Sequence, residues 1–148
     1  MTASTTEPGA AAHREVELQK LDDVVIRFAG DSGDGMQLTG TQFTNTSALV
    51  GHSLAPFPDF PAEIRPPAGT VAPASFQVRI ADYDIHAPGD APDVLVAMNP
   101  ASLKVSLRDL KPNGVLIVNA DEVDERNVKK AGYEPNPLED GSLDQWRV

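Results

Sequence analysis

The sequence predicts an α/β protein with a doubly wound, mostly parallel sheet that is incomplete at its C-terminus. Two observations support this fold class. Short apolar runs with the character of strands alternate along the chain with stretches of helical spacing. Two of the runs, residues 92–99 and 114–119, are continuously apolar, which is typical of parallel strands that are covered on both faces.

The first predicted strand and helix lie in the N-terminal half of the chain. Residues 22–30 are rich in β-branched side chains and end at a glycine, which favours a strand. A helical pattern then begins at Met36, because Met36, Phe43 and Val50 recur every seven residues. Gly51 is a suitable C-terminal stop for this helix.

The middle of the chain predicts a short strand, a long loop and a second strand. Residues 52–70 contain five prolines and little periodicity, so we expect a short strand followed by an irregular loop of a length that is usually functional. Residues 75–83 alternate between apolar and polar side chains, which predicts a strand with one face exposed to water. The apolar face would carry Phe76, Val78 and Ile80, and the wet face Gln77 and Arg79.

The segment between the two continuously apolar runs predicts a helix. Asn99 is a good N-cap, Pro100 fits the first helical position, and Pro112 and Gly114 end the helix. Strand, helix and strand of this length form a βαβ unit with a right-handed crossover. A second such unit beginning at Val24 would complete a Rossmann-like layer, and residues 145–148 have the pattern of a further strand that has only begun.

Composition restricts the chemistry that the chain can perform. The 148 residues include no cysteine, which excludes disulfides, a thiol nucleophile and an iron–sulfur cluster held by this chain's own thiolates. The net charge of −10 disfavours nucleic acid and anionic membranes as partners. No run approaches the roughly 20 apolar residues of a membrane span. Residues 1–21 lack a secretory signal and predict a disordered lead, so we expect a cytoplasmic protein.

A glycine-rich turn, residues 28–40, lies where an α/β protein often binds an anion. Its glycines follow the pattern G-x-x-G-x-G, which fits neither the dinucleotide fingerprint nor the P-loop. Asp59 is the only acid at the distance expected for a ribose-binding residue. In one interpretation the glycines only permit a tight turn and Asp34 caps the helix. In the other, the turn meets a ligand, with Asp31 holding a hydroxyl or a partner's cation.

Arg65 is the second candidate for a binding residue. It lies among prolines in the irregular segment 62–70, and a guanidinium suits bidentate binding of a carboxylate or phosphate. A surface ion pair with one of the 22 acids is the alternative. The sequence contains no self-contained catalytic site: its three histidines and its serines lack the partners that nucleophilic catalysis requires.

Four blocks of the chain together resemble a known family. They read AGDSGDGMQLTG, PDFPAEIRPPAGT with ASFQVRI, PDVLVAMNPASL, and LKPNGVLIVNADEVDERN. In this order and spacing, residues 22–148 are similar to the gamma-type domain of 2-oxoacid:ferredoxin oxidoreductases. The similarity is greatest to the N-terminal part of the alpha subunit of the 2-oxoglutarate type, in which this domain precedes a thiamine-binding pyrimidine domain.

The resemblance implies a part of an enzyme that oxidatively decarboxylates a 2-oxoacid with coenzyme A and passes electrons to ferredoxin. It implies that thiamine diphosphate, magnesium and a 4Fe–4S cluster lie on other parts, namely the pyrimidine domain and the beta subunit. The isolated chain would then be inactive, either as a fragment or as the product of a split gene. Ferredoxin would be an indirect partner only.

The resemblance also implies a set of site residues, which would position coenzyme A or contact a partner: Gly33, Asp34, Gly35, Arg65 and Thr70. The glycine turn would then not be a pyrophosphate cradle. Pro73 departs from the family pattern, in which a glycine is usual in this stretch. A stand-alone nucleotide-binding module and a ligand-free docking domain remain alternatives.

Overall fold

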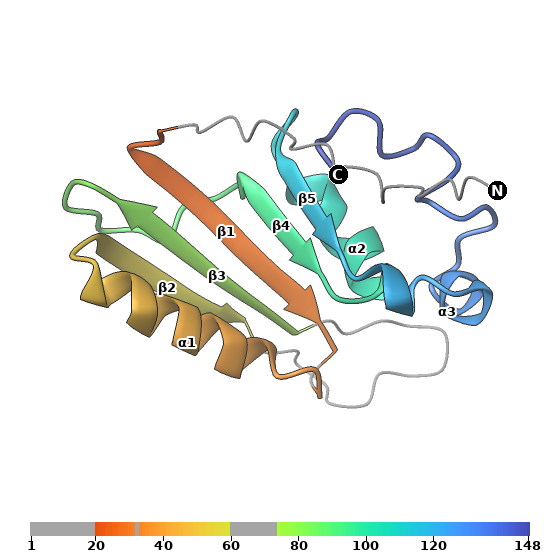
Figure 1. Cartoon of the computed structure of the whole chain (residues 1–148), viewed down its shortest axis with the longest axis horizontal. Helices are drawn as coiled ribbons and strands as arrows, with labels where there is room; N and C mark the ends of the chain where they lie inside the picture. The colour runs from red at the N-terminus through yellow and green to blue at the C-terminus, as the bar shows by residue number, and fades with distance from the viewer. Residues whose placement is uncertain (1–19, 32, 60–73) are drawn as a thin grey trace, which may run out of the picture.

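The computed structural model describes residues 20–31, 33–59 and 74–148, and within these it contains one five-stranded sheet flanked by helices (Figure 1). The strand order is β2-β3-β1-β4-β5. The strands are β1 (Asp23–Gly30), β2 (Ser53–Asp59), β3 (Ala74–Ala81), β4 (Val94–Ala97) and β5 (Val115–Val118). The helices are α1 (Met36–Leu49), α2 (Pro100–Ser106) and α3 (Glu125–Lys130), with short 3₁₀ turns η1 (Leu107–Asp109) and η2 (Ala120–Glu122). The predicted α/β class is confirmed.

The sheet is mostly parallel, but its first βαβ unit differs from the prediction. β4, α2 and β5 form the expected unit, because β4 and β5 are parallel neighbours. β1 and β2 also run in the same direction, yet they are not neighbours. β3 lies between them and pairs antiparallel with both. A crossover helix constrains only the direction of the strand it leads to, so the sequence pattern could not show that a later strand fills the gap.

Two apolar cores lie on opposite faces of the sheet, which makes the fold doubly wound. Phe28 and Ala29 are consecutive in β1 and therefore point to opposite faces. Phe28 packs with Met36 of α1 and with Phe76 on β3. Ala29 belongs to the other core, which includes Leu95, Ala97, Leu103 and Leu116 and is covered by α2. Figure 1 shows α1 in front of the sheet and α2 behind it.

Helix α1 contacts the sheet over a narrow stripe. Met36 and Gly40 are buried, and Phe43 is partly buried against the ring of Phe28, 5.5 Å away between ring centroids. The predicted stripe is wrong at its end, since Val50 is 71% exposed. The helix ends at Leu49, one residue earlier than the seven-residue spacing requires, and Gly51 follows with a positive φ of 92°.

The face of β3 that the sequence predicts to be exposed to water is covered in the structure. Gln77 is only 4% exposed. Its side-chain oxygen accepts a hydrogen bond from Nε of Arg27 at 3.0 Å, and its amide donates to the carbonyl oxygens of Gly89 at 2.7 Å and Pro88 at 3.2 Å. The loop before β4 therefore covers this face. Alternation correctly separated the two faces, but a polar face need not be an exposed one.

β5 was predicted to be a central strand, and it is an edge strand. Ile117 in its middle is 52% exposed. On its outer side the last residues of the chain begin to pair in parallel, with Val115 opposite Arg147. The N–H of Leu116 donates to the carbonyl oxygen of Arg147 at 2.8 Å. The strand-like pattern predicted for residues 145–148 therefore has a counterpart in this bridge.

Two sequence predictions fall on residues that the structure does not describe. The expected disordered lead, residues 1–21, lies almost wholly among residues 1–19, and the long proline-rich loop lies in residues 60–73. Across the described ranges, none of the helices combines the length and the hydropathy that crossing a bilayer would need.

Candidate functional site

The candidate site lies at the edge of the sheet where the parallel strands end. β1, β2, β4 and β5 all point toward this edge in Figure 1. The pairing places the end of β1 level with its neighbours, because Ala29 pairs with Ala97 and Gly30 pairs with Ala74. After β1 the chain turns to α1 on one face, and after β4 it turns to α2 on the other. This divergence forms a topological switch point, the usual place of a ligand in an open α/β sheet.

The glycine turn that follows β1 is held closed by its own aspartates. The carboxylate of Asp34 accepts a hydrogen bond from the N–H of Asp31 at 2.7 Å, and the N–H of Asp34 donates to the carbonyl oxygen of Asp31 at 3.0 Å. Gly35 has a φ of 73°, which favours glycine. A Cβ on Gly33 would meet no atom within 4 Å. The backbone conformation therefore favours glycine at position 35, and local sterics do not require it at position 33.

Asp34 does not cap α1, contrary to the simpler interpretation of the turn. The N-cap of α1 is Gly35, and no side chain makes a capping hydrogen bond there. The Asp34 carboxylate instead accepts a hydrogen bond from the N–H of Asp31, before the helix begins. The reason is the left-handed conformation of Gly35, which separates Asp34 from the first helical turn.

Asn99 joins the glycine turn to the turn that follows β4. It is the predicted N-cap of α2: its side-chain oxygen accepts from the N–H of Ser102 at 2.8 Å, and the Ser102 hydroxyl accepts from the N–H of Asn99 at 3.4 Å. The side-chain amide of Asn99 also donates to the Asp34 carboxylate at 3.4 Å. Sequence reasoning found the cap and missed the contact with Asp34. The contact could have been anticipated, because Asp34 and Asn99 each follow a strand of the same parallel sheet.

The proline-rich segment leaves and returns at this same edge. Gln37 of α1 anchors both of its ends, because its side-chain amide donates to the carbonyl oxygens of Ser75 at 3.0 Å and Asp59 at 3.3 Å. The Ser75 hydroxyl donates to the Asp59 carboxylate at 3.2 Å. The predicted site residues Arg65 and Thr70 belong to this segment and lie outside the described residues.

The position of Asp59 argues against a dinucleotide site of the usual kind. In such a site the acidic residue that holds the ribose ends the strand next to β1. Here Asp59 ends β2, and β3 separates β2 from β1. Its carboxylate also accepts the hydrogen bond from Ser75. The arrangement therefore places this acid two strands away from the glycine turn.

The described part of the edge is acidic. Asp31, Asp34 and Asp59 are all exposed there. Ionised carboxylates only accept hydrogen bonds, so they suit hydroxyl groups, amides or cations and repel phosphate. A phosphate-bearing ligand at this edge would need a compensating cation, and Arg65 on the segment that starts and ends here is the cation that the sequence predicted.

The opposite end of β1 carries an ion pair that is structural in character. Asp23 accepts hydrogen bonds from Arg79 at 2.5 Å and from the hydroxyl of Tyr83 at 2.5 Å. The hydrogen bond from Arg79 is the main reason that the pKa of Asp23 lies below its ordinary value, and it raises the pKa of Arg79. These groups join β1 to β3 at the end farthest from the glycine turn.

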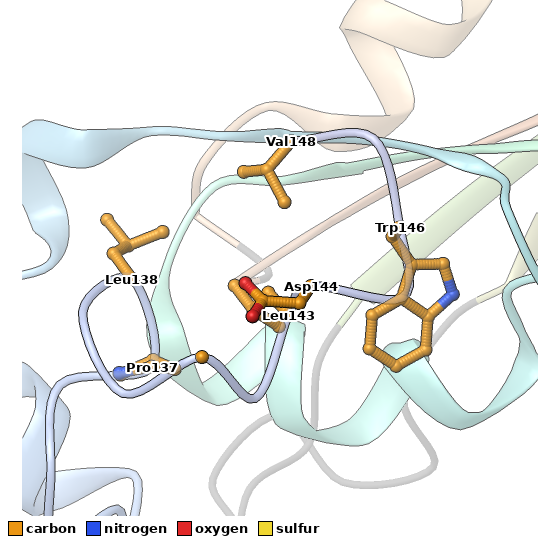
Figure 2. A pocket seen from close by; sticks show the side chains of 7 residues that line it. Pro137, Leu138, Leu143, Asp144, Trp146 and Val148 are labelled. Atoms are coloured by element: carbon orange, nitrogen blue, oxygen red, sulfur yellow. The ribbon is translucent and has the colours of Figure 1, made fainter.

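Two shallow pockets lie away from the glycine turn. One, of about 310 Å³, is formed by the C-terminal segment beside the start of β5, and Figure 2 shows Leu138, Asp144 and Val148 around it. The other, of about 460 Å³, lies beside α3 and is lined in part by Tyr133, whose pKa is raised by burial and by Asp140. Neither pocket contains a predicted site residue. Within the described ranges, no cluster of acids and histidines is suited to hold a metal ion.

Comparison with known proteins agrees with the fold and with the resemblance. Residues 25–146 match the family described as pyruvate ferredoxin/flavodoxin oxidoreductase. The chain belongs to this family. It is 59% identical, over 140 residues, to the 2-oxoglutarate oxidoreductase subunit KorA of Mycobacterium tuberculosis. That match covers 94% of this chain but only 21% of KorA.

Two further relatives come from the same group of enzymes. The 2-oxoglutarate synthase subunit KorC of Methanothermobacter thermautotrophicus is 33% identical over 105 residues, which is 70% of this chain and 53% of KorC. A solved structure of the Magnetococcus marinus 2-oxoglutarate:ferredoxin oxidoreductase, with 2-oxoglutarate, coenzyme A and succinyl-CoA bound, superposes with a TM-score of 0.62 at 25% identity. It covers 82% of this chain and 19% of that chain. These 148 residues thus span about a fifth of two of the relatives.

Proposed function

We propose that residues 22–148 form the gamma-type domain of a 2-oxoglutarate:ferredoxin oxidoreductase. The enzyme would decarboxylate the oxoacid oxidatively, transfer the acyl group to coenzyme A and pass the electrons to ferredoxin. The observation that carries the proposal is the 59% identity to KorA over nearly the whole chain. Because the chain spans only 21% of KorA, activity would require the parts of the enzyme that lie outside these residues.

The thiamine and iron–sulfur chemistry would belong to the partners, a thiamine-binding pyrimidine domain and a beta subunit. The chain has no cysteine, so it does not fit a thiolate-held 4Fe–4S cluster. The described residues also lack a group of acids and histidines suited to hold magnesium beside thiamine diphosphate. The catalytic steps would therefore take place on those partners.

The role of the domain would be to position coenzyme A at the carboxyl edge of the sheet. The switch point between β1 and β4, and the return of the proline-rich segment to the same edge, support this role. Arg65 would bind a phosphate, Thr70 would add a hydroxyl donor, and Asp34 would accept a hydrogen bond from a ligand hydroxyl or amide. Gly33 and Gly35 would let the backbone approach the ligand closely.

Gly33 provides a direct test of this role, because a methyl group there has free space in the structure. In the assembled enzyme, Gly33→Ala and Arg65→Lys should raise the KM for coenzyme A at least fivefold, with the KM for 2-oxoglutarate unchanged. Arg108→Lys, at a side chain that is 79% exposed, is the matched control. Unchanged coenzyme A kinetics in both test variants would contradict the positioning role.

A ligand-free docking role is the alternative, and the three exposed carboxylates at the edge favour it. In that case substitution of Arg65 would not change coenzyme A kinetics. Deletion of the domain would reduce only the assembly of the enzyme. Calorimetric titration of the chain with NAD, NADP, ATP and coenzyme A separates both roles from that of a stand-alone nucleotide module. Tight NAD binding that Asp59→Ala abolishes would favour the stand-alone module.

A further inference from the structure

Helix α1 has an outer surface that is unusual for a helix facing water. Its 14 residues, MQLTGTQFTNTSAL, include no charged side chain, although 23% of the whole chain is charged. There is no acid in its first turn and no base in its last turn. Solvent-facing helices of globular proteins normally carry charged residues on the face opposite the core. The buried side of α1 gives no reason for their absence on the outer side.

The exposed residues of α1 form one continuous face. Leu38, Gln42, Asn45 and Leu49 follow the spacing of a single helical stripe about 16 Å long. Leu38 is 65% exposed and Leu49 is 89% exposed, so each end of the stripe presents a large apolar side chain. We call the exposed residues of this helix the neutral face of α1: Leu38, Thr39, Thr41, Gln42, Asn45, Thr46, Ala48 and Leu49.

One polar group of the neutral face already has a partner within the helix. The hydroxyl of Thr46 donates to the carbonyl oxygen of Gln42 at 2.9 Å, so its proton is already satisfied within the helix. Burying a polar group is costly chiefly when it loses its hydrogen bond to water without replacement. Burial of this face would also separate no charge from water. Apolar ends, uncharged polar groups and depletion of charge are the features of the centre of a protein–protein interface.

The partner best suited to this face is another part of the same oxidoreductase. The chain spans 21% of its KorA relative, so most of that polypeptide lies outside the matched residues and requires surfaces to pack against. A second copy is disfavoured, because it would bring together two chains of net charge −10. The exposed carboxylates of Asp31 and Asp34 just before α1 would add to this repulsion. A nucleic acid or membrane would require basic residues, which this face lacks.

We propose that the neutral face of α1 is a docking surface for an uncharged protein surface belonging to the thiamine-binding part of the same enzyme. This inference rests on the proposed function. It adds a specific contact, separate from the glycine turn, through which the domain is held on its partner. Because no ion pairs would be formed, the association should depend little on ionic strength.

The test introduces one charge into the face without weakening the helix. Lysine is a better helix former than asparagine, so Asn45→Lys should keep α1 intact. Gln145→Lys adds the same charge at another exposed, uncharged residue and serves as the control. The chain is co-expressed with the remaining parts of the oxidoreductase, including the thiamine-binding part. Its affinity for them is then measured at low and high salt, and its assembly state alone is measured by sedimentation.

Asn45→Lys should weaken association at least tenfold, while Gln145→Lys and a change from 50 to 500 mM salt should alter it less than twofold. Wild-type affinity of Asn45→Lys, or failure of the wild-type chain to associate, would overturn the proposal. So would a wild-type dimer of the chain alone that Asn45→Lys dissociates, because the occupant would then be a second copy. An assembled wild-type complex that does not oxidise 2-oxoglutarate would refute the proposed function instead. The measured affinities would still decide whether the neutral face is the docking surface.

Discussion

Gly40 of α1 lies directly against the ring of Phe76 on β3, and a Cβ atom at position 40 would overlap the Cγ and Cδ1 atoms of that ring. Both residues are buried. The absence of a side chain at Gly40 is therefore what lets the helix approach the sheet closely enough to bury Met36 and Phe76 together. Gly40 therefore serves in packing, whereas the sequence analysis includes it in the glycine-rich turn.

Gly40→Ala should destabilise the chain even though alanine is the better helix former. Helix propensity would contribute about 1 kcal/mol in favour of alanine. Overpacking against Phe76 should cost about 1–3 kcal/mol or more, because ring and helix must both shift. Chemical denaturation measures the difference. Thr41→Ala, an exposed neighbour on the same helix, should be neutral or slightly stabilising, and a Gly40→Ala variant as stable as the wild type would contradict the close packing.

Gln77→Ala should strongly destabilise the chain, although the sequence predicts that Gln77 lies on a face exposed to water. The substitution would leave the Gly89 and Pro88 carbonyl oxygens without their donor and Nε of Arg27 without its acceptor. Each unsatisfied buried group costs about 1–3 kcal/mol. Gln42→Ala, at an exposed glutamine, is the control and should change the free energy of unfolding by less than about 0.5 kcal/mol. Equal stability of the two variants would mean that the face is open to water.

Asn99→Ala should remove the cap of α2 and lower the free energy of unfolding by about 1 kcal/mol. Asn99→Ser keeps a capping oxygen and should recover most of the loss. Only asparagine, however, also donates to Asp34. If the glycine turn positions coenzyme A, the serine variant should fold normally and still show a raised KM for coenzyme A in the assembled enzyme. A serine variant with wild-type kinetics would show that the contact between Asn99 and Asp34 has no part in binding.

The Asp23–Arg79 pair should contribute stability that is lost in acid. The folded-state pKa of Asp23 lies below its ordinary value of 3.8, mainly because of the hydrogen bond from Arg79, so the ionised form is favoured by folding. The contribution is complete above about pH 4 and disappears as the pH falls through the lowered folded-state pKa. Asp23→Asn should therefore flatten the decline of stability below about pH 4. Asp84→Asn is the exposed control, and an identical acid profile for Asp23→Asn and wild type would refute the assignment.

Sequence reasoning recovered the elements that depend on local chemistry. The first strand, the start of α1 and the cap of α2 by Asn99 all follow from neighbouring residues, and the structure confirms them. The βαβ unit of β4 and β5 follows from continuous apolar runs and is also confirmed. What the sequence could not show were relations between distant segments. The place of β3 between β1 and β2, the edge position of β5 and the cover over Gln77 all depend on such pairings.

The candidate site was predictable in position but not in its contacts. A glycine turn between a strand and a helix marks the carboxyl edge of a parallel sheet, and the turn lies there. That Asp34 closes the turn rather than capping α1 depends on the left-handed conformation of Gly35, which the sequence permits but does not require. The link from Asp34 to Asn99 crosses 65 residues and is invisible to local patterns.

The antiparallel strand β3 separates two parts of the sheet that should differ in their stability to local unfolding. β2 pairs only with β3, whereas on the other side β4 pairs with β1 directly and β5 pairs with β4. Detachment of β3 would therefore release β2 at the same time and remove the support beneath α1, while β1, β4 and β5 could stay together. We expect the amides of β2 and β3 to exchange with deuterium as one group, earlier than those of β4. The part that opens first would be the part that carries both ends of the proline-rich segment.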